Sequence, residues 1–172
     1  MDLDFLNMFL TTERHSQLTG EIFFELYKQK QSTTYLGLGN RAICYIENLY
    51  ARGYTLVDIS EREPDMLDEL GYIVPSIVMF STNKYMHSAD TMKMGGYPNL
   101  IVEVWSKWEV KHYRQFKHHV YSTGKNTEHW YLTQNSNKIE CWFEDKQLPN
   151  KSLKKVLTTQ GGLQLDLREL AL

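Results

Sequence analysis

The chain has 172 residues, of which 42% are hydrophobic and 23% are charged, and its formal net charge is -2. This composition is ordinary for a soluble globular protein and predicts a single domain over residues 1–172 with a sizeable core. The charge balance excludes a strongly basic nucleic-acid-binding protein, although a local basic patch would still be compatible with that function.

The cysteines and the start of the chain indicate the compartment. Cys44 and Cys141 lack metal-binding spacing, so we expect buried free thiols in a reducing environment. The chain begins Met1-Asp2-Leu3-Asp4 without a basic leader, and no apolar run reaches membrane-spanning length. The expected location is the cytoplasm, with no membrane association.

The first predicted element is a helix over residues 12–30, after a loose lead-in, with Thr12 as its N-cap. Its apolar positions recur at helical spacing: Leu18, Ile22, Phe23 and Leu26. A glycine-containing break follows over residues 33–39. Residues 41–52 fit one helical face that ends at Gly53, although the same run would also be compatible with a strand.

Short strands are predicted in the middle of the chain, over residues 54–59 and 72–80. Pro75 lies inside the second strand and cannot donate to a ladder, which favours an edge position or a bulge. The acidic segment 61–69 between them is predicted to be a solvated loop or a short helical turn. Residues 81–96 are predicted to be a polar connection.

Residues 97–121 (YPNLIVEVWSKWEVKHYRQFKHHVY) are the most informative stretch. Residues 98–106 form a nearly continuous apolar run, which predicts a central strand buried on both faces. Glu103 interrupts this run, and a buried carboxylate needs a partner or a metal ion. A helix is predicted over residues 107–122, with these basic positions: Lys107, Lys111, Arg114 and Lys117.

The remaining elements complete a fold class. Residues 129–133 and 138–143 predict a hairpin with a turn at 134–137, and residues 152–158 and 163–167 predict edge strands. The order predicts an α/β protein whose mixed β-sheet is flanked by an N-terminal helix and a crossover helix. This is the order of the restriction-endonuclease-like core, although topology alone is weak evidence for function.

The residues from Pro98 to Trp130 resemble the Uma2 (DUF820) family of the PD-(D/E)XK nuclease superfamily. Residues 98–106 (PNLIVEVWS) match most of the family's strand motif proline-aspartate-leucine-valine-valine-glutamate-valine-leucine-serine. Lys117 and Tyr121 match the lysine and tyrosine of its following helix, and residues 128–130 match the block that opens its next strand. Residues 72–78 and 15–26 resemble its preceding strand and its N-terminal helix.

The resemblance implies a metal-dependent phosphodiesterase site and DNA as a partner. Glu103 would bind Mg²⁺ or Mn²⁺, and Lys117 would lie near the attacking water or the scissile phosphate, since Trp105 occupies the lysine position on the strand. Ser106 and Tyr121 would support them.

Departures from the family pattern weaken this site. Ser76 occupies the position of the metal-binding aspartate, and a hydroxyl is a poor primary ligand for Mg²⁺. Asn99 and Tyr113 replace two further aspartates that are common in the family. Glu103 would then bind a cation weakly unless another acid compensates. The candidates for that acid are Asp58, Asp65 after Pro64, Asp90 and Glu21.

Other interpretations stay open for most of these residues. Glu103 could form a purely structural ion pair with Lys117 or Arg114. The histidines lack the four-residue spacing of a helical metal site, which favours surface positions: His15, His112, His118 and His119. The tryptophans could stack on bases, but core or dimer-interface positions are favoured: Trp105, Trp108, Trp130 and Trp142.

Two functions therefore remain. One is a Uma2-type nuclease that Ser76 impairs. The other is an inactive nuclease-fold protein that binds nucleic acid or protein. A homodimer through the aromatic hairpin at residues 129–143 is compatible with either.

Overall fold

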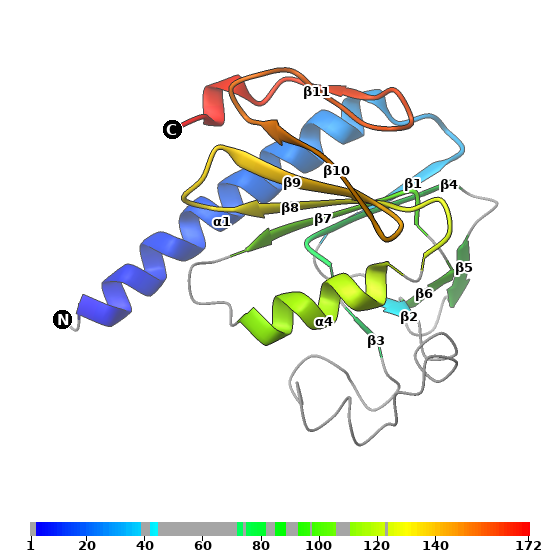
Figure 1. Ribbon diagram of the computed structural model, residues 1–172, viewed down its shortest axis with the longest axis horizontal. Helices are drawn as coiled ribbons and strands as arrows, with labels where there is room; N and C mark the ends of the chain where they lie inside the picture. The colour runs from blue at the N-terminus through cyan, green and yellow to red at the C-terminus, as the bar shows by residue number, and fades with distance from the viewer. Residues whose placement is uncertain are drawn as a thin grey trace.

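The computed structural model describes most of the chain (Figure 1). The described residues are 3–38, 42–44, 72–73, 75–81, 85–88, 93–96, 98–105, 111–122 and 124–172. The predicted strand at 54–59 and the acidic segment at 61–69 lie outside these ranges. Within the described ranges, no helix is long and apolar enough to cross a membrane.

The N-terminal helix α1 spans Leu3–Gln29. The predicted start at Thr12 is wrong, because Leu3, Leu6 and Phe9 continue the three- to four-residue apolar spacing of a helix toward the N-terminus. Leu18, Ile22 and Leu26 are fully buried. Burial of each contributes roughly 1.5–3 kcal/mol to stability.

A six-stranded mixed sheet forms the centre of the described structure, in the order β1-β4-β7-β8-β9-β10. Its strands are β1 (Thr34–Leu38), β4 (Ile77–Ser81), β7 (Leu100–Trp105), β8 (Glu128–Thr133), β9 (Lys138–Phe143) and β10 (Lys146–Ser152). β7 runs parallel to β8 and antiparallel to β4. The parallel pair requires a crossover, and helix α4 (Lys111–Tyr121) lies between the two strands in the chain, as predicted.

Two predictions before β7 are wrong in detail. The single strand predicted at 72–80 is two strands in different sheets, β3 (Tyr72–Ile73) and β4, because Pro75 between them has no amide to continue a ladder. Residues 33–39 contain strand β1 rather than only a break, since its single glycine is compatible with pairing along β4.

Two further predictions are wrong because their segments contribute strands to a four-stranded sheet of order β3-β2-β6-β5. β2 (Ala42–Cys44) lies where a helix was favoured, and β5 (Tyr85–Ser88) and β6 (Lys93–Gly96) lie within the predicted polar connection. These strands are three or four residues long and mostly polar or glycine-containing, so no two-residue apolar alternation reveals them.

The C-terminal part confirms the predicted hairpin of β8 and β9 and adds strand β10. β10 escaped prediction because it is polar and contains Pro149, which an edge strand with a bulge between Leu148 and Lys151 accommodates. β11 (Leu157–Thr158) and β12 (Gln164–Leu165) form a separate two-stranded sheet, and the 3₁₀ helix η2 (Arg168–Leu170) follows.

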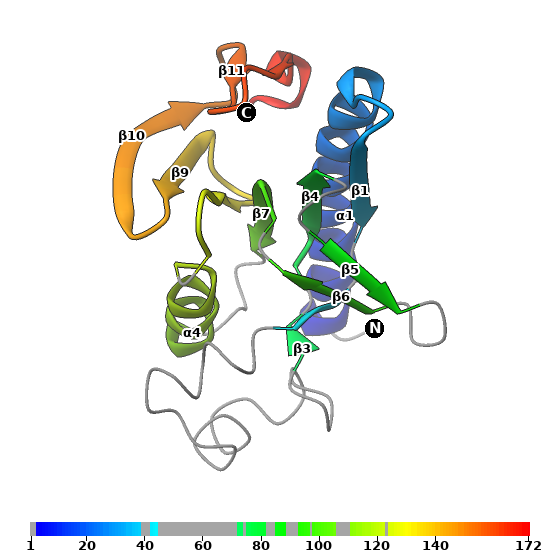
Figure 2. The ribbon, with the colours of Figure 1, turned by 90° about the vertical axis from the view of Figure 1, so that its right-hand side faces the viewer.

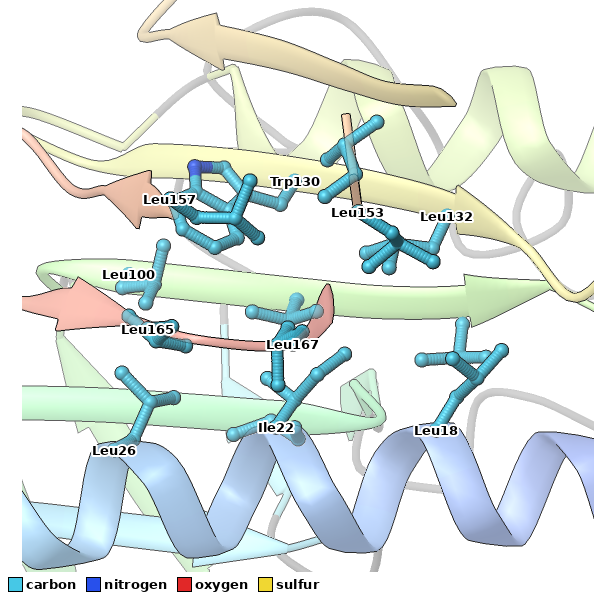
Figure 3. Close-up of a cluster of buried hydrophobic side chains, with 14 of the residues drawn as sticks. Leu18, Ile22, Leu26, Leu100, Trp130, Leu132, Leu153, Leu157, Leu165 and Leu167 are labelled. Atoms are coloured by element: carbon cyan, nitrogen blue, oxygen red, sulfur yellow. The ribbon is translucent and has the colours of Figure 1, made fainter. Parts of the chain in front are cut away.

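The two faces of the central sheet differ in character. The face beside α1 holds the apolar core, to which β7 contributes Leu100, Val102 and Val104 and the C-terminal segment contributes Leu157, Leu165 and Leu167 (Figure 3). The alternate β7 residues Ile101, Glu103 and Trp105 therefore face the side of α4. Figure 2 shows α1 and α4 on opposite sides of β7. All six residues of β7 are buried, as predicted for a covered central strand.

Candidate active site

Glu103 is a buried carboxylate on the α4 side of β7, and only 1% of its surface is exposed. Lys117 Nζ lies 2.9 Å from its Oε1, and the Tyr121 hydroxyl donates a hydrogen bond to the same oxygen. Ser76 Oγ donates to Oε2 at 3.2 Å. Three protein groups thus compensate the loss of water around this charge.

The register of two elements brings these groups together. In the antiparallel pairing of β4 with β7, Ile77 lies opposite Val102, so Ser76 lies opposite Glu103. On α4, Lys117 and Tyr121 are four residues apart and therefore project from the same face of the helix. The structure thus brings together Glu103, Lys117 and Tyr121, and the ion pair with Lys117 is the contact expected of a purely structural bridge.

Val104, the next residue of β7, is also held by a side chain. The β4–β7 register ends at Ile77, and the Val104 amide donates to Ser76 Oγ at 3.1 Å. Burial lowers the pKa of His15 on α1, although the nearby Val104 backbone and Glu103 oppose the shift. The Ser76 hydroxyl therefore accepts the Val104 amide at the point where the pairing with β4 ends.

The histidines do not form a metal centre within the described ranges, where no group of three or more His, Cys, Asp or Glu side chains converges. His118 Nδ1 lies 3.1 Å from the Tyr131 hydroxyl, and burial lowers the pKa of His118 while Glu140 opposes the shift. His129 is fully buried, and burial lowers its pKa to about 3, with a further contribution from His118. The side chain of His112 lies outside the described structure.

The tryptophans are mainly internal, as predicted. Trp105 is buried and stacks on Tyr131 with ring centroids 4.6 Å apart, and the Arg114 guanidinium lies 4.8 Å from the Trp105 ring. Trp130 is fully buried, whereas Trp142 is half-buried. Trp108 lies outside the described residues.

The other candidate site residues do not add a described carboxylate beside Glu103. Glu21 is exposed on α1, which does not suit a ligand of a buried site. Asp58, Asp65 and Asp90 lie outside the described residues, as do Ser106 and the side chain of Tyr113. Asn99 precedes β7 by one residue and so lies roughly 13 Å along the strand from Glu103. Its replacement of an aspartate therefore removes no carboxylate from the neighbourhood of Glu103.

The described residues supply one part of a divalent-cation site rather than a complete one. Mg²⁺ prefers several oxygen ligands, of which at least one or two are carboxylates. The described contacts of Glu103 are an ammonium group, a phenol and a hydroxyl. These three groups neutralise and hydrogen-bond the Glu103 carboxylate, and they do not supply the further carboxylate that a bound metal ion would need.

Glu128 has a structural role that the sequence did not reveal. Its carboxylate accepts hydrogen bonds from Trp130 Nε1 at 2.7 Å and from the Gln160 amide at 2.7 Å, and Lys151 Nζ lies 3.0 Å away. Glu128 is 2% exposed. It therefore ties β8 to β10 and to the C-terminal segment, and only its match to a family motif distinguished it beforehand.

Cys141 is a buried free cysteine, as predicted. Burial raises the pKa of its thiol to about 11, which keeps the group protonated and unreactive at neutral pH. The side chain of Cys44 lies outside the described structure.

Comparison with known proteins supports the fold. No family model matches the chain, and no curated protein does. One matching solved structure is described as a "putative nuclease belonging to DUF820" from Anabaena variabilis ATCC 29413. The two chains are 10% identical and superpose with a TM-score of 0.65, and the match covers 92% of this chain and 82% of that one. The predicted restriction-endonuclease-like fold class is confirmed.

Proposed function

We propose that this chain belongs to the Uma2 (DUF820) family and is a metal-dependent nuclease whose activity Ser76 impairs. The observation that carries this proposal is that Glu103 and Lys117 lie together, because a metal held by a carboxylate and a nearby lysine can supply the activated water and the charge neutralisation that phosphodiester hydrolysis requires. The sequence resemblance and the fold of the Anabaena protein support the same assignment.

In this proposal each residue has a defined task. Glu103 would bind Mg²⁺ or Mn²⁺, which would supply charge neutralisation and an activated water. Lys117 would stabilise negative charge at the scissile phosphate of DNA. Tyr121 orients the Glu103 carboxylate through its hydroxyl. Ser76 supplies a hydroxyl where the family has an acid, so the cation would bind weakly.

Cleavage assays test this proposal. Plasmid DNA and single-stranded DNA are incubated with purified protein in Mg²⁺, in Mn²⁺ and in EDTA. We expect slow cleavage that requires the metal and that Glu103→Ala abolishes. Lys111→Met is a matched control, since Lys111 is an exposed residue on the same helix. Equal inertness of the wild type and Glu103→Ala across all conditions would refute nuclease activity.

A second candidate is a catalytically inactive nuclease-fold protein that binds nucleic acid or protein. It is favoured by the contacts of Glu103, since Lys117 balances its charge and Ser76 fills the position of an acid. This candidate predicts binding of labelled DNA in EDTA, measured by fluorescence anisotropy, without cleavage in any metal.

A homodimer is a separate proposal that light scattering can test. The hairpin of β8 and β9 was the expected interface, but Trp130 and Tyr131 are buried within the chain. Trp142 and Phe143 are half-buried and remain the aromatic residues that this hairpin could offer to a partner.

A further inference from the structure

We propose that the outer face of α1 is the interface of a homodimer, in which the α1 helices of two copies pack antiparallel about a two-fold axis at Phe24. This surface is separate from the hairpin of β8 and β9. The proposal goes beyond the proposed function and does not depend on it, because assembly can be measured without DNA or metal.

The outer face of α1 exposes two aromatic side chains. Leu18, Ile22 and Leu26 of the same helix point toward the central sheet (Figure 3). Phe24 and Tyr27 lie on the opposite face and are each 54% exposed. They are three residues apart, so the two rings share one patch of the surface. Aromatic side chains are enriched at interfaces between proteins, where their burial stabilises association. The patch therefore suits a partner surface better than water.

The aromatic patch lies in a stripe of exposed positions that runs along α1. These positions recur every three or four residues, which keeps them on one side of the helix: Glu13, Gln17, Gly20, Glu21, Phe24, Tyr27 and Lys28. Apart from the helix backbone itself, nothing lies within 4 Å of a Cβ atom placed on Gly20, so the surface is open one turn before Phe24. The stripe is thus apolar at its centre, with an acid before Phe24 and a base after it.

A second copy of the same stripe complements it. In a two-fold interface, residue i of one copy contacts residue j of the other, and j contacts i. For antiparallel helices with the axis between positions 24 and 25, Phe24 meets Phe24 of the partner subunit. Glu21 and Lys28 lie equally far from that point and on the same side of the stripe, so Glu21 meets Lys28 of the partner subunit. Gly20 lies on the side where Tyr27 of the partner subunit would pack, and its lack of a side chain lets the helices approach closely.

The charges select this orientation. A parallel pair of α1 helices would place Glu21 beside Glu21 and Lys28 beside Lys28, and like charges would repel. In the antiparallel pair, each Lys28 lies between Glu21 of the partner subunit and its own Glu25, which it already contacts. Exposed ion pairs contribute little affinity, so the aromatic rings would supply most of it and the charges would set the register.

Sedimentation equilibrium in EDTA tests the dimer. We expect a monomer–dimer equilibrium in the micromolar range, because one helix face is smaller than the ~800 Å² per partner of a standard interface. Phe24→Asp places two carboxylates at the axis and should weaken the dimer at least about tenfold. Since Phe24 is exposed, the variant should fold normally, which circular dichroism and its Tm check.

A charge swap tests the orientation. Glu21→Lys and Lys28→Glu each create a like-charged contact and should weaken the dimer about threefold to tenfold at low salt. The double variant Glu21→Lys/Lys28→Glu restores opposite charges and should recover most of the wild-type affinity. Glu13→Lys is the matched control, since it makes the same change of charge on the same stripe. Its counterpart across the axis would lie beyond Gln29, where the partner helix ends, so its affinity should equal that of the wild type.

The outcomes decide between the possible surfaces. A dimer that Phe24→Asp disrupts and that the double charge swap restores supports the proposal. A chain that stays monomeric at every concentration overturns it, as does a dimer that Phe24→Asp leaves intact. Loss of the dimer in Trp142→Ala alone would assign the interface to the hairpin of β8 and β9 and would also overturn it. Single swaps that leave the affinity unchanged, or a double variant weaker than both, would overturn the antiparallel arrangement. None of these measurements involves cleavage of DNA, so failure of the dimer leaves the proposed function untouched.

Discussion

Removal of Lys117 should destabilise the protein strongly, because it leaves Glu103 charged and buried without its counter-ion. Breaking a buried ion pair by removal of one partner costs about 3–5 kcal/mol. Lys117→Met keeps most of the apolar packing of the side chain. Tyr121 and Ser76 still donate to the carboxylate, so we expect a loss near the lower end of this range.

A double-mutant cycle with Glu103→Gln isolates the interaction. The double variant contains no buried charge at this position. Its loss of unfolding free energy should be at least about 2 kcal/mol smaller than the sum of the losses in the two single variants. Urea unfolding followed by the fluorescence of the four tryptophans gives each free energy of unfolding in metal-free buffer. A cost below about 1 kcal/mol for Lys117→Met, or additive single variants, would show that the pair is not a coupled buried unit.

Two further predictions concern the other buried ionisable groups. Glu128→Gln should lower the free energy of unfolding by about 2–3 kcal/mol in urea titrations. The glutamine amide cannot accept a hydrogen bond from every donor around it, and Lys151 loses its counter-charge. An unchanged urea midpoint would contradict the structural role of Glu128. Burial lowers the pKa of His129 to about 3 from an unfolded value near 6.5, so the unfolded state binds the proton first as the pH falls. Stability should therefore be complete above about pH 6.5 and should fall below it, by about 2 kcal/mol between pH 7 and pH 5. Neither ring nitrogen of His129 makes a hydrogen bond of ordinary geometry within the described structure, so phenylalanine can replace the ring without the loss of a hydrogen bond. His129→Phe should therefore remove most of this loss of stability between pH 7 and pH 5. If the stability of the variant falls as steeply with pH as that of the wild type, His129 is not its cause.

The central strand and its helix were predictable because their sequence pattern is local. An apolar run as long as β7 is recognisable by itself, and its single acid marks the polar side of the sheet. A buried acid on this strand predicts a cationic partner, and the sequence left Lys117 and Arg114 as alternatives; the ion pair with Lys117 required the position of α4 against β7. The pairing of Ser76 with Glu103 required the register of β4 against β7, which the sequence pattern did not fix.

The elements that escaped prediction depend on distant partners. β10 is polar and contains Pro149, and it is a strand because β9 offers it an edge. In the sequence, Pro75 predicts an irregularity inside one strand, whereas in the structure it lies between β3 and β4, which belong to two different sheets. His15 lies on α1, in the opposite layer, yet Glu103 and the Val104 backbone affect its pKa, which no local spacing could indicate.

Introduction of an acid at position 76 tests most directly whether Glu103 and position 76 belong to a metal-dependent nuclease site. Ser76 Oγ lies 3.2 Å from Glu103 Oε2, so Ser76→Asp would place a second carboxylate beside the first. We expect this variant to have a lower Tm than the wild type in EDTA because of charge repulsion, and we expect Mn²⁺ to raise its Tm above that of the wild type. We also expect faster Mn²⁺-dependent cleavage of DNA, which Glu103→Ala abolishes. A Ser76→Asp variant that is folded but shows neither response to Mn²⁺ would contradict the assignment of Glu103 and position 76 to a metal-dependent nuclease site.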